Sequence, residues 1–216
     1  MDAGMKRRVW MLDCSLLALG LVLPGLAGAE TRPQRLLVLG DSLSAEYGIA
    51  RGSGWVALLQ QRLAARKPPV EVLNASISGD TTAGGRSRLP GLLSQHRPSH
   101  VVIELGGNDA LRGLPLKNTQ ENLLAMVRAA KAAGARVLLV GMQVPPNYGA
   151  SYGRDFSALF ESVAKSEKTA LTPFLLKGVA DRPDAQDWFQ GDRIHPLAKA
   201  HPLMLEQVWQ GLKPLL

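Results

Sequence analysis

Two hydrophobic patterns alternate along most of the chain. The first is a short, nearly continuous run of apolar residues, which is typical of a strand buried on both faces of a sheet. It predicts strands over residues 35–40, 70–74, 100–105, 135–140 and, with a less regular pattern, 172–176. The second is an apolar residue at every third or fourth position, which is typical of a helix packed on one side. It predicts helices over residues 55–63, 81–96, 118–133, 155–168 and 202–212.

Residues at the helix ends agree with these limits. Ser53 is placed to cap the first helix, and Asn118 with Glu121 has the spacing of a capping box at the start of the third. Gly134 follows the end of that helix, where glycine is favoured. Pro202 suits the first turn of the last helix, because a proline inside a helix removes a hydrogen bond.

Strands that alternate with helices predict an α/β fold, with one doubly wound parallel sheet covered by helices on both faces. We expect about five parallel strands in a single domain over residues 30–216, a length that suits one core. Ligand sites of such sheets lie beyond the carboxyl ends of the strands. Polar residues directly after each strand are therefore the first candidates for chemistry.

Residues 1–29 have the features of a secretory signal peptide. A basic cluster at 6–8 precedes a mostly apolar run, Pro24-Gly25 breaks that run, and Ala27-Gly28-Ala29 matches a small-x-small cleavage site. We predict cleavage after Ala29. The alternative is a transmembrane anchor, but Asp13 and Pro24-Gly25 interrupt the apolar stretch and leave it short for a span.

A signal peptide predicts a periplasmic or secreted protein, and the cysteine usage is compatible with that location. Cys14 is the only cysteine and falls inside the predicted signal peptide, so residues 30–216 need no disulfide. Asp13, just before it, does not suit a lipoprotein site. Met5 precedes the basic cluster directly and is an alternative start of the chain.

The charge pattern narrows the choice of partners. The formal net charge is +7, and the predicted signal peptide carries three basic and two acidic residues, which leaves +6. The basic residues are scattered and are not interleaved with aromatic residues, so nothing resembles a nucleic-acid-binding motif. We expect no nucleic-acid partner and at most a weak peripheral attraction to anionic lipid surfaces.

Ser42, Gly79 and Asn108 follow the first, second and third predicted strands. The carboxyl ends of parallel strands meet at one edge of the sheet, so we expect these residues to lie together. Asp192 and His195 are three positions apart in a polar turn, where the carboxylate can reach a ring nitrogen. A serine nucleophile needs a base, and the base needs an acid to orient it. Ser42, His195 and Asp192 therefore predict the catalytic triad of a serine hydrolase.

The other strand-end residues suit the negative charge that forms when a serine attacks a carbonyl. The backbone N–H groups of Ser42 and Gly79 and the side-chain amide of Asn108 supply three neutral donors for an oxyanion hole. Taken singly, each of these residues is more commonly a cap or a turn residue. Their shared edge of the sheet favours one common role.

Other residues of the same types fit the site less well. Ser44 does not occupy the end of its strand, His96 and His100 lie away from the carboxyl edge, and His201 has no acid three residues before it. We expect Asp41 to brace the turn through backbone hydrogen bonds. The sequence has no cluster of His and Cys residues of the kind that binds a metal, so we expect no metal site.

Four strings carry these residues in order: LVLGDSLSAEYGI at 37–49, NASISGDTT at 74–82, ELGGNDALRGLPL at 104–116 and DRIHP at 192–196. In these strings the chain resembles the SGNH (GDSL) hydrolases, and closely their bacterial branch of multifunctional thioesterases, lysophospholipases and arylesterases.

The resemblance implies a flavodoxin-like three-layer α/β/α sandwich and an enzyme without a cofactor that is periplasmic or secreted. It also implies that Ser42 is the nucleophile, that Asp192 and His195 complete the triad, and that Gly79 and Asn108 are oxyanion donors.

Three positions depart from what the family often carries: Ala110 stands in place of a glycine, and Arg193 and Leu197 are larger or less polar than usual. These changes bear on the preferred acyl and leaving groups rather than on the reaction type.

The substrate is predicted from two apolar loops. Leu111 and Leu114 follow Asn108, and Pro146 and Tyr148 lie after the fourth strand, so all four are expected to line an acyl-binding groove; ordinary loop packing is the alternative. We therefore expect a monomeric esterase and thioesterase that acts on small acyl esters, acyl thioesters and lysophospholipids. A carbohydrate O-deacetylase of the same superfamily and a non-catalytic module that binds acyl groups or lipids are the alternatives.

Overall fold

The computed structural model describes residues 1–2 and 34–216. The predicted signal peptide, apart from its first two residues, and its cleavage point after Ala29 lie outside that part of the chain. Within the described residues, none of the helices combines the length and the apolarity that crossing a membrane requires.

A five-stranded parallel sheet forms the centre of the fold, as the apolar runs predict. The strand order is β2-β1-β3-β4-β5, so the chain crosses over between β2 and β3. The strands are β1 (Gln34–Gly40), β2 (Val70–Asn74), β3 (His100–Glu104), β4 (Arg136–Val140) and β5 (Ala170–Thr172). Leu36 of β1 pairs with Val72 of β2 on one side and with His100 of β3 on the other. The predicted doubly wound α/β fold is confirmed.

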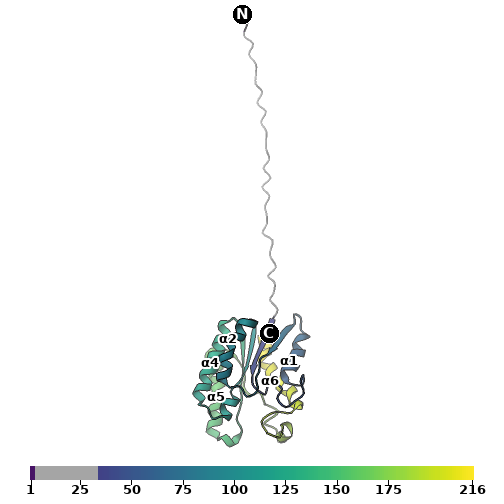
Figure 1. Ribbon diagram of the computed structural model, residues 1–216, viewed down its shortest axis with the longest axis vertical. Coiled ribbons are helices and arrows are strands. Elements are labelled where there is room, and N and C mark those ends of the chain that lie inside the picture. Colours follow the sequence, from purple (N-terminus) through teal and green to yellow (C-terminus); the bar gives the residue numbers. More distant parts are fainter. Residues whose placement is uncertain (3–33) are drawn as a thin grey trace. The chain divides into compact units, whose positions relative to one another are not determined.

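Helices cover both faces of the sheet, which gives three layers (Figure 1). Helices α2, α4 and α5 lie on one face, and α1 and α6 lie on the other. The α-helices are α1 (Trp55–Ala64), α2 (Thr82–His96), α3 (Gly107–Leu111), α4 (Leu116–Ala132), α5 (Ala150–Glu167) and α6 (His201–Leu212). Short 3-10 helices are η1 (Pro146–Tyr148), η2 (Ala185–Trp188), η3 (Ala198–Ala200) and η4 (Lys213–Leu215).

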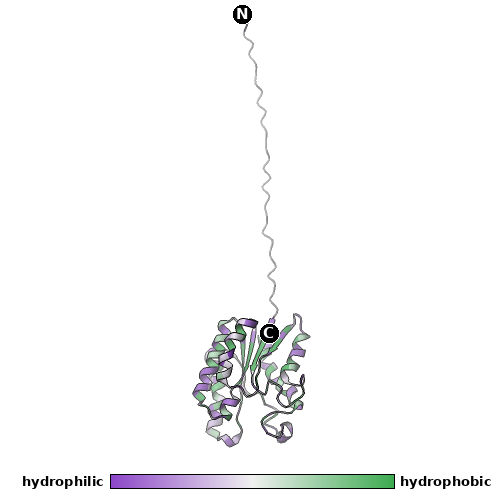
Figure 2. Cartoon of the chain, viewed as in Figure 1, coloured by the Kyte–Doolittle hydropathy of each residue, from purple (hydrophilic) through white to green (hydrophobic). Residues whose placement is uncertain are grey.

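The core lies between the sheet and these helices. All five residues of β3 are buried, which explains why it reads in the sequence as one continuous apolar run around its polar ends. The strands are the most hydrophobic part of the ribbon, whereas the helices alternate between hydrophobic and hydrophilic stripes (Figure 2). The largest fully buried side chains include Trp55 of α1 and Phe156 and Phe160 of α5.

Several predicted element limits are wrong. The fifth strand ends at Thr172 rather than beginning there, and the short helix α3 was not predicted. The capping box at Asn118 does not form, because α4 already begins at Leu116 and has no side-chain cap. Ser53 does not cap α1 either; its hydroxyl donates to the Ala50 carbonyl.

The two edges of the sheet differ in what they hold. At the edge where the strands begin, His100 and Arg136 both contact the carbonyl of Leu215, so the C-terminus closes that edge. At the other edge, β1, β2 and β3 lead into the loops that carry Ser42 and Gly79 and into helix α3. This carboxyl edge is where parallel sheets place their ligands.

Candidate active site

Ser42, His195 and Asp192 form a continuous hydrogen-bonded chain. The Oγ atom of Ser42 lies 2.8 Å from Nε2 of His195, and the Nδ1 atom of His195 lies 2.6 Å from Oδ2 of Asp192. Ser42 comes from the turn after β1, whereas the other two residues come from the loop before η3. The structure thus brings together three residues separated by as many as 153 positions in the chain.

The loop that carries His195 is fixed by its own backbone. The Gln190 N–H donates to the His195 carbonyl at 2.7 Å, and Phe189 and Pro196 form an antiparallel bridge. Asp192 Oδ1 accepts from the N–H groups of Ile194 and His195, which leaves Oδ2 for the imidazole ring. One carboxylate therefore orders both the turn and the histidine side chain.

The same contacts set the charge of Asp192. Its burial acts to raise the pKa of the carboxyl, but hydrogen bonds from the His195 backbone and ring and from the Ile194 N–H outweigh it and lower the pKa to about 2. Asp192 is therefore a carboxylate at neutral pH. A permanent negative charge at this atom stabilises the imidazolium that forms when His195 accepts a proton.

An aromatic side chain supports the histidine from the other side. The ring of Tyr47 lies 4.3 Å from the ring of His195 at an interplanar angle of 41°. Tyr47 follows Ser42 in the same loop, and its N–H donates to the Ser42 carbonyl. Sequence patterns do not indicate this contact, because Tyr47 does not directly follow a predicted strand.

Three potential donors come from the segments that follow β1, β2 and β3. The backbone N–H groups of Ser42 and Gly79 donate no hydrogen bond to any other group within residues 34–216. Gly79 has φ +79°, a left-handed conformation that favours glycine. Asn108 is near the start of α3, and its amide nitrogen lies in the same site. This arrangement has the composition of an oxyanion hole.

Asp41 has a larger part in the site than bracing a turn. Its Oδ1 accepts from the Leu43 N–H at 3.0 Å, as expected, but its Oδ2 accepts from the Asn108 side-chain amide, also at 3.0 Å. One amide hydrogen of Asn108 is used by this bond, and the second is left for another acceptor. Asp41 thus fixes the orientation of the Asn108 amide.

Glu104 is a second buried carboxyl group, close to Asp41. Glu104, the last residue of β3, accepts from the Ser44 hydroxyl at 2.6 Å. Burial is the main cause that raises the pKa of both groups, to about 6 for Asp41 and well above the ordinary value for Glu104, and the negative charge of Asp41 raises the pKa of Glu104 further. Gly40 makes room for the pair: a Cβ there would lie 2.7 Å from the Ser44 side chain and 2.9 Å from Glu104 Oε2.

Two arginines hold the loop that carries Gly79. Arg88 of α2 pairs with Asp80 at 2.8 Å and also donates to the Ala75 carbonyl. Arg112, which follows α3, donates to the Gly79 carbonyl at 2.7 Å. The second contact ties the Gly79 loop to the helix that carries Asn108.

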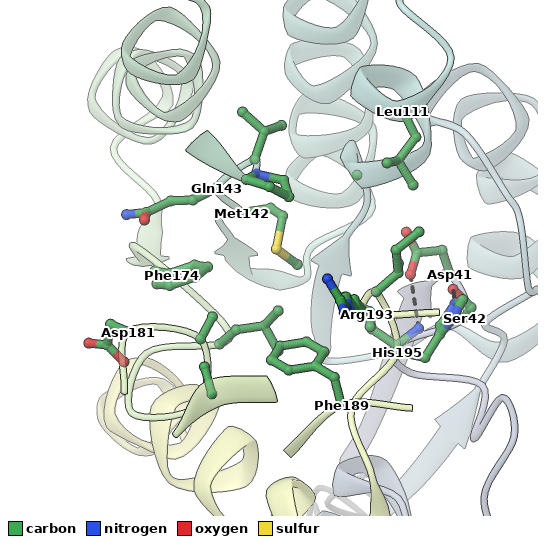
Figure 3. A pocket seen from close by; sticks show the side chains of 18 of the residues that line it. Asp41, Ser42, Leu111, Met142, Gln143, Phe174, Asp181, Phe189, Arg193 and His195 are labelled. Carbon is green, nitrogen blue, oxygen red and sulfur yellow. Dashed lines mark hydrogen bonds between the residues drawn. The ribbon is translucent and has the colours of Figure 1, made fainter. Parts of the chain in front are cut away.

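A cavity of about 490 Å³ opens beside the triad. Figure 3 shows Ser42 and His195 at one end of it and Phe174 and Asp181 at the other. Most of its wall is apolar, with side chains from the ends of four strands and from the segment that includes η2. The apolar wall includes Leu43, Leu111, Met142, Val144, Pro145, Pro146, Phe174, Leu176, Phe189 and Ile194.

The predicted substrate-binding residues divide into two groups. Leu111 and Pro146 line this cavity, but Leu114 and Tyr148 do not. Leu114 is exposed on the surface, and Tyr148 stacks against Tyr152 at the start of α5.

The sequence did not point to Met142, Phe174 and Phe189 as lining residues. Met142 and Phe174 each follow a strand end by two positions, β4 and β5 respectively, so the rule that located Ser42 would have found them.

The rival residues do not reach the site. Ser44 is buried against Glu104, and His100 lies at the opposite edge of the sheet. Nδ1 of His201 accepts from the Trp55 N–H, which joins α6 to α1. Across the described residues, no three His, Cys, Asp or Glu side chains gather in a way that would hold a metal ion.

Comparisons with known proteins agree on one family. Residues 38–203 match the model of the GDSL-like lipase/acylhydrolase family. The esterase TesA of Pseudomonas aeruginosa is 54% identical over 187 residues, which cover 87% of this chain and 92% of that protein. Thioesterase 1/protease 1/lysophospholipase L1 of Escherichia coli K12 is 42% identical over 189 residues, or 88% of this chain and 86% of that protein.

Solved structures give the same result. The crystal structure of TesA superimposes with a TM-score of 0.81 at 54% identity and covers 85% of this chain and all of that one. The psychrotrophic esterase EstA from Pseudoalteromonas, in a structure inhibited by monoethylphosphonate, gives a TM-score of 0.77 at 40% identity and covers 84% of this chain and 97% of that one.

Proposed function

The chain belongs to the GDSL-like lipase/acylhydrolase family, and from that premise we propose that it hydrolyses acyl esters and acyl thioesters through an acyl intermediate on Ser42. The observation that carries the proposal is the chain of contacts from Ser42 Oγ through the two ring nitrogens of His195 to Asp192, at 2.8 and 2.6 Å. Both distances are those of hydrogen bonds ready for proton transfer.

The first half of the reaction forms the acyl-enzyme. The Ser42 oxygen attacks the carbonyl carbon of the substrate while Nε2 of His195 takes the hydroxyl proton. Asp192 holds the other side of the ring and stabilises its positive charge. The negative charge on the former carbonyl oxygen is met by the N–H groups of Ser42 and Gly79 and by the free amide hydrogen of Asn108. His195 then gives its proton to the leaving alcohol or thiol, and the carbon–leaving-group bond breaks.

The second half releases the acid. A water molecule gives one proton to His195 and attacks the acyl carbon, which forms a second oxyanion in the same hole. The bond to Ser42 then breaks, and the serine oxygen recovers its proton from His195. Ser42, His195 and Asp192 return to their starting state without a metal or an organic cofactor in any step.

The size and the apolar wall of the cavity favour a substrate with an acyl chain. A volume of about 490 Å³ with an apolar wall is far larger than an acetyl group needs, which argues against an O-deacetylase. A complete and connected triad argues against a module that only binds acyl groups. Two relatives are named arylesterase and thioesterase/lysophospholipase, and we propose aryl esters, acyl thioesters and lysophospholipids as the substrate classes here.

We also propose that the protein is exported and acts as a monomer. The proposal of export rests on the basic cluster, the apolar run and the Ala27-Gly28-Ala29 site in the sequence. The described fold needs no second copy to complete the site, because the triad and all three oxyanion donors come from one chain.

The direct test is a serine substitution with a matched control. Ser42→Ala should reduce kcat for a soluble p-nitrophenyl ester by about 10⁴-fold or more, because the nucleophile is lost. Ser44→Ala, two residues away, removes a buried hydroxyl and should keep kcat within about ten-fold once folding is checked by circular dichroism. Full activity in a folded Ser42→Ala variant would refute the proposal.

A further inference from the structure

The exposed hydrophobic side chains of this protein are not scattered. Apart from the terminal Met1, the large exposed hydrophobic residues among those described are Tyr47, Ile77, Leu111, Leu114 and Ile194, with 36% to 53% of each accessible to solvent. We call these five residues the apolar rim. Single exposed apolar residues are ordinary on a protein surface, but a group of them at one place marks an interaction site.

Every member of the apolar rim adjoins a residue of the active site. The tilted ring of Tyr47 contacts the ring of His195, and Ile194 directly precedes His195 in the chain. Ile77 comes two residues before Gly79, and its N–H donates to the carbonyl of Gly40, next to the catalytic turn.

The other two rim residues are on the Asn108 side of the site. Leu111 ends α3 and lines the cavity, and the N–H of Leu114 donates to the Asp109 carbonyl. The five residues come from four different segments, which follow β1, β2, β3 and β5. They lie at one edge of the sheet because of the fold, not because they belong to one apolar stretch of sequence.

Two exposed arginines lie among these residues. Arg112 is next to Leu111, and Arg193 is between Asp192 and Ile194. Within residues 34–216 neither guanidinium forms an ion pair with an acidic side chain. Figure 3 shows the Arg193 side chain pointing into the cavity near His195.

We propose that the apolar rim, with Arg112 and Arg193, docks on an anionic phospholipid surface and places the mouth of the acyl cavity against the lipid. Apolar side chains at the mouth would enter the boundary between headgroups and acyl chains, while the two arginines would contact phosphate groups. This inference rests on the proposed function in one respect: it assumes that the cavity receives the acyl chain of the substrate.

A lipid surface fits this rim better than a partner protein does. Two rim residues, Leu111 and Ile194, line the cavity that Ser42 also lines, so a protein that covered the rim would also cover this approach to Ser42. A lipid layer covers the same side chains and supplies the substrate through the same opening. The positive net charge of the chain favours an anionic layer over a neutral one.

The test measures vesicle binding separately from catalysis. Residues 30–216 are used, because they contain every described element of the fold and lack the apolar run before Ala29 that would itself enter lipid. Ser42→Ala is the background, so that the vesicles are not consumed. We expect it to bind vesicles of phosphatidylglycerol and phosphatidylcholine, and to bind pure phosphatidylcholine more weakly.

Two double variants divide the surface into its parts. Ile77→Ser with Leu114→Ser should weaken binding to both kinds of vesicle by about ten-fold, because less apolar area is buried. Arg112→Gln with Arg193→Gln should weaken binding to the anionic vesicles alone, by about five-fold for each arginine. The control is Arg97→Gln, which removes one positive charge at the opposite edge of the sheet, where Arg97 follows the end of α2. It should change binding by less than about two-fold.

The outcomes separate this proposal from the proposed function. An absence of vesicle binding at low salt, or an equal loss in Arg97→Gln, would overturn the docking surface. A dimer in sedimentation that Ile77→Ser abolishes would assign the rim to a second copy instead. With Ser42 restored, Ile77→Ser should hydrolyse a soluble short-chain ester at the normal rate and vesicle-borne lysophospholipid more slowly. Failure of the unaltered protein to hydrolyse the soluble ester would count against the proposed function and leave the docking result intact.

Discussion

The two edges of the sheet use a histidine in opposite ways. At the amino edge His100 is buried, and both of its ring nitrogens have partners, the Ser99 hydroxyl at 2.9 Å and the Leu215 carbonyl at 2.8 Å. Burial lowers the pKa of His100, so it stays neutral. At the carboxyl edge His195 is half-buried, and its Nε2 contacts Ser42, which faces the cavity.

The difference extends to the backbone. At the carboxyl edge the N–H groups of Ser42 and Gly79 have no acceptor within residues 34–216. At the amino edge the chain end and the side chain of Arg136 are tied to each other. Unpaired donors cost stability, and they remain only where the rest of the fold holds them in place. One edge therefore closes the fold, and the other leaves donors free for a substrate.

The comparison of the two histidines gives the largest expected effect. His195→Gln should lower kcat/KM for a soluble ester by about 10⁴-fold or more, because the base is lost. His100→Gln should leave the activity of the folded protein within a few-fold and lower the free energy of unfolding by about 1–3 kcal/mol. Ester kinetics and urea unfolding of both variants measure this. If His100→Gln lost as much activity as His195→Gln, the two edges would not be separable.

The next effect concerns two asparagines that donate to different acceptors. Asn108→Ala should reduce kcat by about 100- to 1,000-fold with a smaller change in KM, because one oxyanion donor is lost. Asn74 donates to the Ser44 carbonyl in the same region but is outside the site. Asn74→Ala should destabilise the turn without this loss of kcat. Equal losses of kcat in the two variants would mean that Asn108 acts only through local packing.

The smallest effect concerns Asp41, whose pKa is raised by burial to about 6. Between its ordinary value and about 6, the folded state holds this proton more firmly than the unfolded state does. Stability due to Asp41 should therefore fall as the pH rises through that window, by on the order of 3 kcal/mol. Asp41→Asn should remove the slope and lose part of kcat, because Asn108 is held less firmly. Thermal unfolding from acid to neutral pH measures this; an unchanged slope in Asp41→Asn would place the buried proton elsewhere, with Glu104 as the first candidate.

Much of this fold could be predicted because β1, β3 and β4 contain short continuous apolar runs, which are typical of strands buried on both faces. The fifth strand was misplaced because Leu175 and Leu176 are buried like strand residues although the chain has already turned at Pro173. There the Leu175 N–H donates to the Gly141 carbonyl in a loop rather than in the sheet ladder. Helix α3 was missed because five residues that begin at a glycine are too short to show a period.

The proposed reacting groups of the site could be picked out from the sequence. The contacts that orient them and the wall of the cavity could not. Ser42, Asn108 and Gly79 were found because each follows a strand, and Asp192 with His195 because of their spacing. The hydrogen bond from Asn108 to Asp41 could not be predicted, because it joins side chains 67 positions apart. The orientation of these side chains depends on packing. The cavity wall depends in the same way on how the loop that carries Phe189 folds back, which no local pattern encodes.

Covalent labelling with a fluorophosphonate tests the central claim most directly. The reagent reacts with a serine that an adjacent base activates, and peptide mass spectrometry then locates the adduct. We predict one adduct per chain, on Ser42 and not on the neighbouring Ser44, and none in the folded His195→Gln variant, where Ser42 remains but its base is gone. Labelling of another serine, or undiminished labelling of Ser42 without His195, would contradict an activated Ser42 at the carboxyl edge of the sheet.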